Sequence, residues 1–247
     1  SSQRHASEQE SEFLASTDNF FRPTSVRTGH DGALWVVDMY RFVIEHPEWI
    51  PIKFRLTLDL RAGSNQGRIY RIYPVDQPPR PIEKLADADI ATLVGALDSP
   101  NGPQRDLAQQ LLIAKNDSSS ASLLEKTVTD GKLPQGRLQA MCTLDGMGQL
   151  RAEVITQAVR DDHAGVRRHA VRLSEDKLGN SPELATAVLA TVADDDAKVA
   201  LQLAFTLGEW NDAQAGKALG KLAAKWTAEP FILAAVVSSA RPNLDEL

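Results

Sequence analysis

The sequence has one cysteine, Cys142, among 247 residues. A single thiol excludes an intrachain disulfide, a paired-cysteine zinc site and the two-cysteine motif that attaches haem c. Long apolar runs are also missing, since no stretch approaches the roughly 18 residues that span a bilayer. The longest run, residues 231–237, has the length of a buried helix face. We therefore expect no transmembrane segment, and we expect Cys142 to lie in a helical core.

Positive charge is scarce relative to negative charge. The chain has 27 Lys and Arg against 33 Asp and Glu, which gives a formal net charge of −6. Proteins that bind nucleic acids or anionic membranes need a clustered basic face. We expect no nucleic-acid partner and no metal site, and we expect the small basic group at residues 167–172 to form a solvated face paired with nearby acids.

Residues 17–80 have the composition of β-strands. Two β-rich runs, residues 22–29 and 33–39, flank the turn His30-Asp31-Gly32, and a third run follows at residues 67–73. Asp-Gly between two such runs is a strong hairpin signal. The pattern predicts one blade of a β-propeller, although a propeller is built from about four to eight blades. The chain is therefore expected to be a piece of a larger protein.

A long segment, residues 40–66, separates the second and third predicted strands. Loops of this length in a compact domain are usually functional or ordered by a partner. We expect Trp49 to anchor the loop in the core. Four prolines at residues 74, 78, 79 and 81 then stiffen the chain and mark a domain boundary.

Helical repeats follow from Pro81 onward. Similar apolar segments recur every 30–34 residues, each with a small residue at the same place: Ala108, Ala140, Ala170, Ala204 and Ala234. This period, with two helices per unit, is typical of an α-solenoid, in which small residues let neighbouring helices approach closely.

Helix starts support the repeat pattern. Ser181, followed by a proline and an acid, predicts an N-cap, and Asp196 is expected to cap the next helix. We therefore expect an α+β chain by content: a polar segment at residues 1–16, a terminal propeller blade with a long inserted loop at 17–80, and a solenoid of about five helix pairs at 81–247.

Three motifs, in order, resemble a known family. They are FRPTSVRTGHDGALWVVDMYR at residues 21–41, IEHPEWIP at 44–51 and DLRAGSNQGRIYR at 59–71. They resemble the membrane-bound dehydrogenase family of the planctomycete type, and the helices at 167–173 and 201–209 look like the repeats of that family. Its members join a propeller similar to soluble quinoprotein glucose and sorbosone dehydrogenases to HEAT-like repeats and a C-terminal cytochrome c module.

The resemblance implies that the parent protein is a periplasmic or otherwise extracytoplasmic dehydrogenase of sugars or other alcohols. PQQ, calcium and haem c are implied for the full-length protein, and no cofactor is expected in this chain. The implied partners are the rest of the parent polypeptide, namely the remaining propeller and the cytochrome c module. One blade cannot complete a site built from several, so we expect the isolated chain to be inactive.

One end of the blade is expected to form the active face. The first strand starts there, the second strand ends there and the 40–66 loop leaves from there, as in propellers whose central cavity opens at such a face. A carboxylate, a histidine and several arginines gathered at that end could hold an anionic cofactor, a metal or a polarised carbonyl. The candidates are Arg22, Asp38, Tyr40, Arg41, Glu45, His46 and Arg61.

Each candidate also has a structural interpretation. Asp38 can cap a turn, Arg41 and Arg61 can pair with nearby acids, and His46 can pack within its loop. The catalytic residues therefore stay unassigned.

Two other functions remain open. The chain could be a non-catalytic HEAT-repeat scaffold that binds a protein partner on its solenoid surface, or a stand-alone adaptor whose β segment covers the first repeat. Further propeller blades upstream and a haem-attachment motif downstream would favour the dehydrogenase. A tight protein complex without quinone or metal would favour the scaffold, and a start codon just before residue 1 would favour the adaptor.

Overall fold

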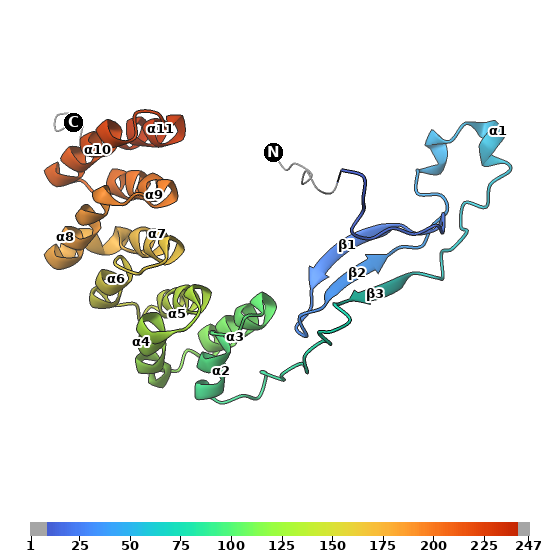
Figure 1. Ribbon diagram of the computed structural model, residues 1–247, viewed down its shortest axis with the longest axis horizontal. Helices are drawn as coiled ribbons and strands as arrows, with labels where there is room; N and C mark the ends of the chain where they lie inside the picture. Colours follow the sequence, from blue (N-terminus) through green and yellow to red (C-terminus); the bar gives the residue numbers. More distant parts are fainter. Residues whose placement is uncertain (1–8, 242–247) are drawn as a thin grey trace. The chain divides into compact units, whose positions relative to one another are not determined.

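The computed structural model describes residues 9–241 and divides into two compact units, residues 1–82 and 83–247. The division follows the proline-rich segment. Most of the regular structure is helical, and one small antiparallel sheet lies in the first unit, so the class is α+β (Figure 1). None of the helices between residues 9 and 241 is long and apolar enough to cross a membrane.

The sheet has three antiparallel strands in the order β1-β2-β3. Its strands are β1 (Pro23–Thr28), β2 (Leu34–Asp38) and β3 (Arg68–Ile72). Val36, at the centre of β2, lies opposite Val26 of β1 and Tyr70 of β3. The three predicted strands and the turn between the first two are confirmed. An irregularity in pairing between Pro23 and Ser25 places Pro23 opposite Asp38.

Asp31 holds the turn between β1 and β2. Its buried carboxylate accepts hydrogen bonds from Ala33 N (3.0 Å) and Trp35 Nε1 (3.1 Å), and it forms an ion pair with Arg71 of β3 (2.6 Å). Burial alone would raise the pKa of Asp31, but these partners outweigh it and lower the pKa. Gly32 follows with φ of 82°, a conformation that glycine adopts without strain. One carboxylate therefore ties the first hairpin to the third strand.

The 40–66 segment extends from the end of the sheet where β2 ends, and it contains two short helices (Figure 1). These are η2 (Pro47–Trp49) and α1 (Ile52–Arg55). The expectation that Trp49 anchors the loop in the core is wrong, because its side chain is 82% exposed. Ile52 and Leu56 nearby are also exposed, so the loop turns its large apolar groups outward.

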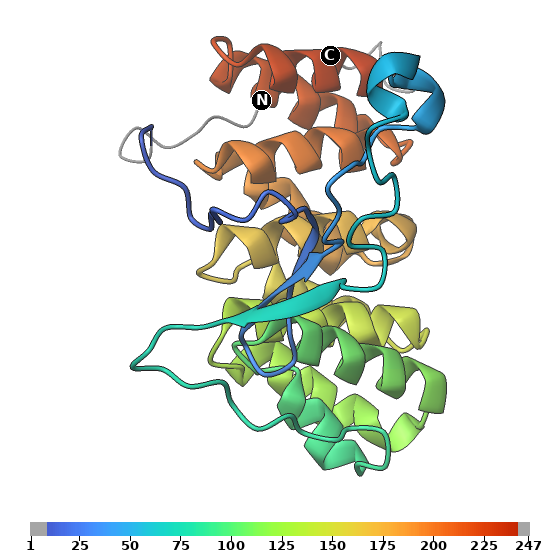
Figure 2. The same ribbon diagram turned by 90° about the vertical axis from the view of Figure 1, so that its right-hand side faces the viewer.

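The second unit contains ten α-helices within the described residues, which follow one another as five pairs. Alternate helices form two rows that stack in sequence order (Figures 1 and 2). One row comprises α2 (Ile90–Ala96), α4 (Ala121–Asp130), α6 (Ala152–Ala158), α8 (Pro182–Ala190) and α10 (Ala213–Lys225). The other comprises α3 (Gly102–Lys115), α5 (Pro134–Gly146), α7 (Ala164–Leu173), α9 (Ala197–Gly208) and α11 (Pro230–Ser239). Short 3₁₀ segments in the connections are η3 (Ser118–Ser120), η4 (Glu175–Asn180) and η5 (Thr191–Ala193).

Side-chain caps begin several of these helices. Ser181 accepts a hydrogen bond from Leu184 N, and Asp196 accepts from Lys198 N and Val199 N, as the sequence predicts. Each cap satisfies an amide that has no partner inside the helix. The helix starts are thus encoded locally.

The predicted alanines lie where the longer helices meet, with one exception. Ala108, Ala140, Ala170 and Ala204 are fully buried, whereas Ala234 is exposed. Its neighbour Ala235, only 3% exposed, faces the core instead, so the repeat was placed one residue early in α11. The reason is that residues 231–237 are apolar throughout, and such a run does not indicate which side of a helix faces inward.

Leucine substitution in α11 tests this assignment. Ala235→Leu adds volume to a packed position and should lower the free energy of unfolding by about 1–3 kcal/mol. Ala234→Leu, on the exposed side of the same helix, should change it by less than about 0.5 kcal/mol. Urea unfolding followed by circular dichroism at a helical wavelength measures both. Equal losses in the two variants would contradict the assignment.

Candidate functional site

Asp38 is a buried structural acid at the end of β2. Asp38 is 1% exposed, and its Oδ1 atom accepts hydrogen bonds from Arg22 N (2.8 Å) and Tyr40 N (2.9 Å). Its Oδ2 atom accepts from the Tyr70 hydroxyl (3.4 Å). Three chain segments therefore meet at one carboxylate. Of the two interpretations of Asp38, the capping role is the one that these contacts describe.

Tyr40 is fixed in an uncommon conformation directly after this cap. Its φ of 51° lies in the left-handed region, which few non-glycine residues adopt. The hydroxyl donates to Asp18 Oδ2 (2.8 Å), the ring stacks on Phe20 with 5.3 Å between centroids, and the Arg68 guanidinium lies 3.8 Å from the ring centroid. The hydrogen bond to Asp18 raises the pKa of Tyr40. These contacts hold the phenol in place through its ring and its hydroxyl.

Arg41 and Glu45 line a cleft beside the sheet. The Arg41 Nη2 atom donates to the Leu60 carbonyl (3.0 Å), which joins the two ends of the 40–66 segment. The cleft has a volume of about 300 Å³, and its remaining walls are mostly apolar, with one hydroxyl from Ser64. A cation and a carboxylate on such walls could orient a small polar ligand.

The other candidates make local contacts. His46 caps η2, since Glu48 N donates to its Nδ1 atom (3.4 Å). Arg61 belongs to a turn in which its N–H donates to Asp59 Oδ1 (2.9 Å). The Arg22 guanidinium donates to the Phe21 carbonyl (2.9 Å). The seven candidates thus divide into a strand-end cluster of Arg22, Asp38 and Tyr40, a cleft pair of Arg41 and Glu45, and two loop residues, His46 and Arg61, that do not line the cleft.

The cofactors that the resemblance implies do not fit this donor set. Within residues 9–241, no three His, Cys, Asp or Glu side chains gather as calcium or another metal would require. Haem c attachment needs two thiols, and Cys142 lies part-buried against the helical core. PQQ is a quinone with three carboxylates. Among the described residues that line the cleft, Arg41 is the one cation, which is too few to pair with three carboxylates.

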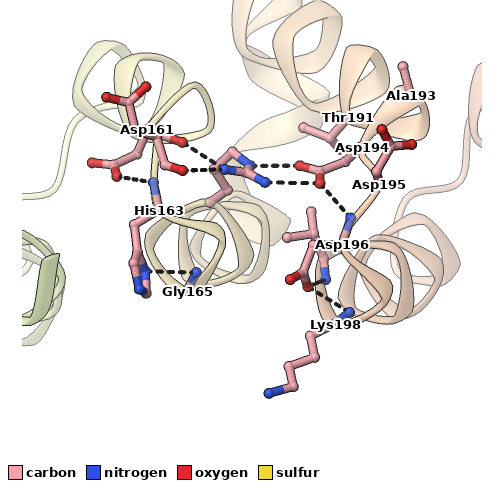
Figure 3. A network of polar contacts seen from close by, with 12 residues as sticks. Asp161, His163, Gly165, Thr191, Ala193, Asp194, Asp195, Asp196 and Lys198 are labelled. Carbon is pink, nitrogen blue, oxygen red and sulfur yellow. Dashed lines mark hydrogen bonds and ion pairs between the residues drawn. The ribbon is translucent and has the colours of Figure 1, made fainter.

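A second polar feature lies in the helical unit and centres on Arg167. Its Nε and Nη2 atoms donate to both carboxylate oxygens of Asp194 (2.6 and 3.0 Å). Its Nη1 atom donates to the carbonyls of Asp161 (2.9 Å) and Asp162 (3.0 Å). Figure 3 shows these contacts between the turn at Asp161 and the turn at Asp194. Arg167 is salt-paired, but the expectation of a solvated face paired with nearby acids is wrong for this residue: its side chain is largely buried and its partner, Asp194, lies in the next repeat.

The same arrangement occurs one repeat earlier. Arg137 donates to both oxygens of Asp161 (2.6 and 2.7 Å) and to the Gly131 carbonyl (2.9 Å), which lies six residues before it. Arg167 also reaches the carbonyl six residues before it. We call these two arginines and their acids, Asp161 and Asp194, the arginine ladder. The sequence signal that was missed is the arginine near the start of successive similar helices, six residues after a turn.

The ladder acids are held in the charged form. Burial would raise the pKa of Asp161, but the hydrogen bonds from Arg137 and from the His163 amide outweigh burial and lower it. Burial likewise opposes ionisation of Asp194, and the hydrogen bonds from Arg167 and the Asp196 amide lower its pKa. Both acids therefore stabilise the fold only while they are ionised.

Residues 1–76 match the family model of a domain of unknown function, DUF7133. The match includes the whole sheet and the 40–66 segment. No curated protein matches the chain.

Asp38→Ala tests the cap at the end of β2. The substitution leaves two amide N–H groups without their acceptor, and we expect it to lower the local stability of the sheet by about 1–3 kcal/mol. Asp59→Ala removes one exposed turn contact and should cost less than about 0.5 kcal/mol. Amide hydrogen exchange of β2 residues measures both effects without interference from the helices. Unchanged exchange in Asp38→Ala would refute the structural role.

The ladder predicts a pH dependence. A lowered pKa in the folded state contributes stability that is present above the unfolded pKa of about 3.9 and is lost as the pH falls through the folded pKa. We expect the unfolding free energy to fall between about pH 5 and pH 2. Asp161→Asn should be less stable than the parent chain at pH 7 and should show a shallower decline in acid.

Urea unfolding at pH 7, 5, 4 and 3, followed by helical circular dichroism, measures this decline. Asp130→Asn, at an exposed residue outside the ladder, serves as the control and should keep the slope of the parent chain. If Asp161→Asn declined as steeply as the control, the ladder would not be the source of the acid sensitivity.

Proposed function

We propose that this chain supplies the closing blade of a β-propeller and a HEAT-like helical spacer to a larger extracytoplasmic dehydrogenase. The class of enzyme comes from the three motifs at residues 21–71, which resemble the propeller region of quinoprotein sugar and alcohol dehydrogenases. The single observation that carries the structural role is the open sheet of the first unit.

The open sheet exposes apolar side chains at both edges. Within the described residues, β1 and β3 each pair only with β2. Val26 on β1 is 54% exposed, and Ile69 on β3 is 60% exposed beside its partner Val37 of β2, which is also exposed. Unpaired edges and apolar faces favour pairing and packing with further strands, and so few strands are marginally stable alone. In a propeller, neighbouring blades would bury the apolar faces, and a fourth strand, which propeller blades typically have, would pair with one of the edges.

The helical unit supports the spacer role. Its five helix pairs, its repeat of 30–34 residues and the arginine ladder between successive turns are all features of a solenoid, in which each repeat contacts its neighbours. A solenoid of this kind keeps the domains at its two ends at a fixed distance from each other. In this proposal it separates the propeller from the cytochrome c module.

The cleft of Arg41 and Glu45 would then contribute to the active face of the complete propeller. The other blades would supply the quinone and calcium sites. The isolated chain is inactive in this proposal, and purified chain given an aldose and a redox dye should show no turnover. Dye reduction that depends on the chain and on the aldose would contradict this.

The native protein in its source cells tests the proposal. We expect a band well above 26.9 kDa, the mass of this chain, on a denaturing gel after immunodetection, and we expect the same band to stain for haem. A haem-free band at 26.9 kDa would overturn the proposal.

The second candidate is a non-catalytic HEAT-repeat scaffold. It is favoured by the helical unit, whose two stacked rows present an extended surface of the kind that solenoids use to bind proteins. A tight complex of the native protein with another protein, without bound quinone or metal, would favour the scaffold over the dehydrogenase.

A further inference from the structure

A cleft of about 420 Å³ lies over the N-terminal ends of α5, α7 and α9. Its polar lining comes from Gln135, His163, Arg168, His169, Asp196 and Lys198, and its apolar lining includes Leu138 and Val166. Three successive repeats therefore contribute to one concave site. The cleft lies wholly within the helical unit, so its binding chemistry is independent of the assignment of the sheet to a dehydrogenase.

His163 presents a hydrogen-bond donor at this cleft. Its Nδ1 atom accepts a hydrogen bond from Gly165 N (3.1 Å), as the N-cap of α7. Since Nδ1 acts as the acceptor, the neutral ring carries its proton at Nε2. The ring belongs to an exposed residue, and its outward nitrogen donates.

Hydrogen bonding fixes the tautomer of His169 as well, but its protonated nitrogen is buried and does not face a ligand in the cleft. Its Nε2 atom lies 3.1 Å from the Arg168 Nη2 atom. Arginine only donates, so Nε2 accepts and the neutral ring carries its proton at Nδ1. That Nδ1 atom is buried and has no hydrogen-bond partner within residues 9–241. Burial lowers the pKa of His169, and the charges of Arg168 and Arg172 lower it further, which favours the neutral ring.

Acceptors are few at the same cleft. The carboxylate of Asp196 caps α9, and its Oδ1 atom already accepts from Lys198 N (2.8 Å) and Val199 N (3.2 Å). Arg168 and Lys198 add two positive charges against this one negative charge. The lining is therefore rich in donors and locally positive, in a chain whose net charge is −6. A complementary ligand must bring acceptors and negative charge.

We propose that this cleft binds a carboxylate-rich segment of a partner protein. Carboxylates accept from arginine, lysine and histidine donors in charge-assisted hydrogen bonds. The donors come from α5, α7 and α9, so successive acidic side chains of an extended segment can each meet one of them. Leu138, which is partly exposed, offers an apolar surface for the methylene groups of glutamate.

A hexaglutamate peptide with blocked ends is the probe for this proposal. We expect saturable binding to the full chain at low ionic strength by isothermal titration calorimetry, which weakens as salt is added. The double variant Arg168→Gln/Lys198→Gln should bind about tenfold more weakly, because each removed cation ends one charge-assisted contact. Hexaglutamine should not bind.

A matched control removes two positive charges elsewhere. Lys115→Gln/Lys126→Gln changes exposed lysines outside the cleft and should alter the affinity by less than about twofold. If Arg168→Gln/Lys198→Gln disturbs the helices, the single reversal Lys198→Glu, at an exposed residue, should weaken binding about tenfold, whereas Lys126→Glu should not.

Three results would overturn the proposal. They are the absence of saturable hexaglutamate binding, an equal loss of affinity in the cleft and control variants, and full displacement of the peptide by inorganic phosphate at the same concentration of anionic groups. The last result would assign the cleft to small oxyanions instead of an acidic segment.

Discussion

Arg167 is the contact on which the helical unit and its cleft both depend. One guanidinium binds the carboxylate of Asp194 and the carbonyls of Asp161 and Asp162, so the turn before α7 and the turn before α9 are joined through a single side chain (Figure 3). The planar guanidinium has five donors and can bind acceptors of both turns at once, which the compact ammonium group of a lysine could not do. Because His163 follows the first turn and Asp196 ends the second, this arginine also sets two walls of the cleft.

The ladder is incomplete at the first repeat. Arg105 donates to the Ser99 carbonyl (2.7 Å), six residues before it, as Arg137 and Arg167 do in their repeats. Its Nε atom is buried without a hydrogen-bond partner in the described part of the chain. Arg137 and Arg167 each pair with an acid in the turn of the next repeat. In the turn that follows Arg105, the position that corresponds to Asp161 is occupied by Gly131, which has no carboxylate. The arginine–acid pairs of the ladder thus link the repeats from α5 to α9.

The two units bury their apolar residues to different extents. The helical unit has one continuous core that runs from α2 to α11. In the first unit the buried apolar residues are few, among them Ala33, Val36 and Val43, while most large apolar side chains of the 40–66 segment and several at the strand edges are exposed. A sheet of three strands is too small to bury the apolar side chains of both its faces and those of the long loop without a further partner. This contrast is the physical basis for the proposal that the sheet is part of a larger β-structure.

Local signals predicted much of the fold. The Asp-Gly turn, the strand runs and the caps at Ser181 and Asp196 depend on neighbouring residues, so the sequence sufficed for them. Ala234 and Trp49 were misplaced because burial of an apolar residue depends on what packs against it, and a uniformly apolar or loop sequence does not show this.

The candidate site was harder to predict for the same reason. Asp38 has the same chemistry as a cap or as a ligand, and only the positions of Arg22, Tyr40 and Tyr70 around it show which groups it binds. The cleft of Arg41 and Glu45 depends on how the ends of a long segment meet. The arginine ladder had a sequence signal, the six-residue spacing, but its partner acids lie a whole repeat away along the chain.

A double-mutant cycle on Arg167 and Asp194 tests most directly whether one side chain joins the two turns. The unfolding free energies of the parent chain, Arg167→Gln, Asp194→Asn and the double variant give the coupling between the two groups. We expect a coupling of at least about 1 kcal/mol, because the pair is largely buried and bidentate. Additive losses, with a coupling below about 0.3 kcal/mol, would mean that the two turns are held by the packing of the helices and not by Arg167.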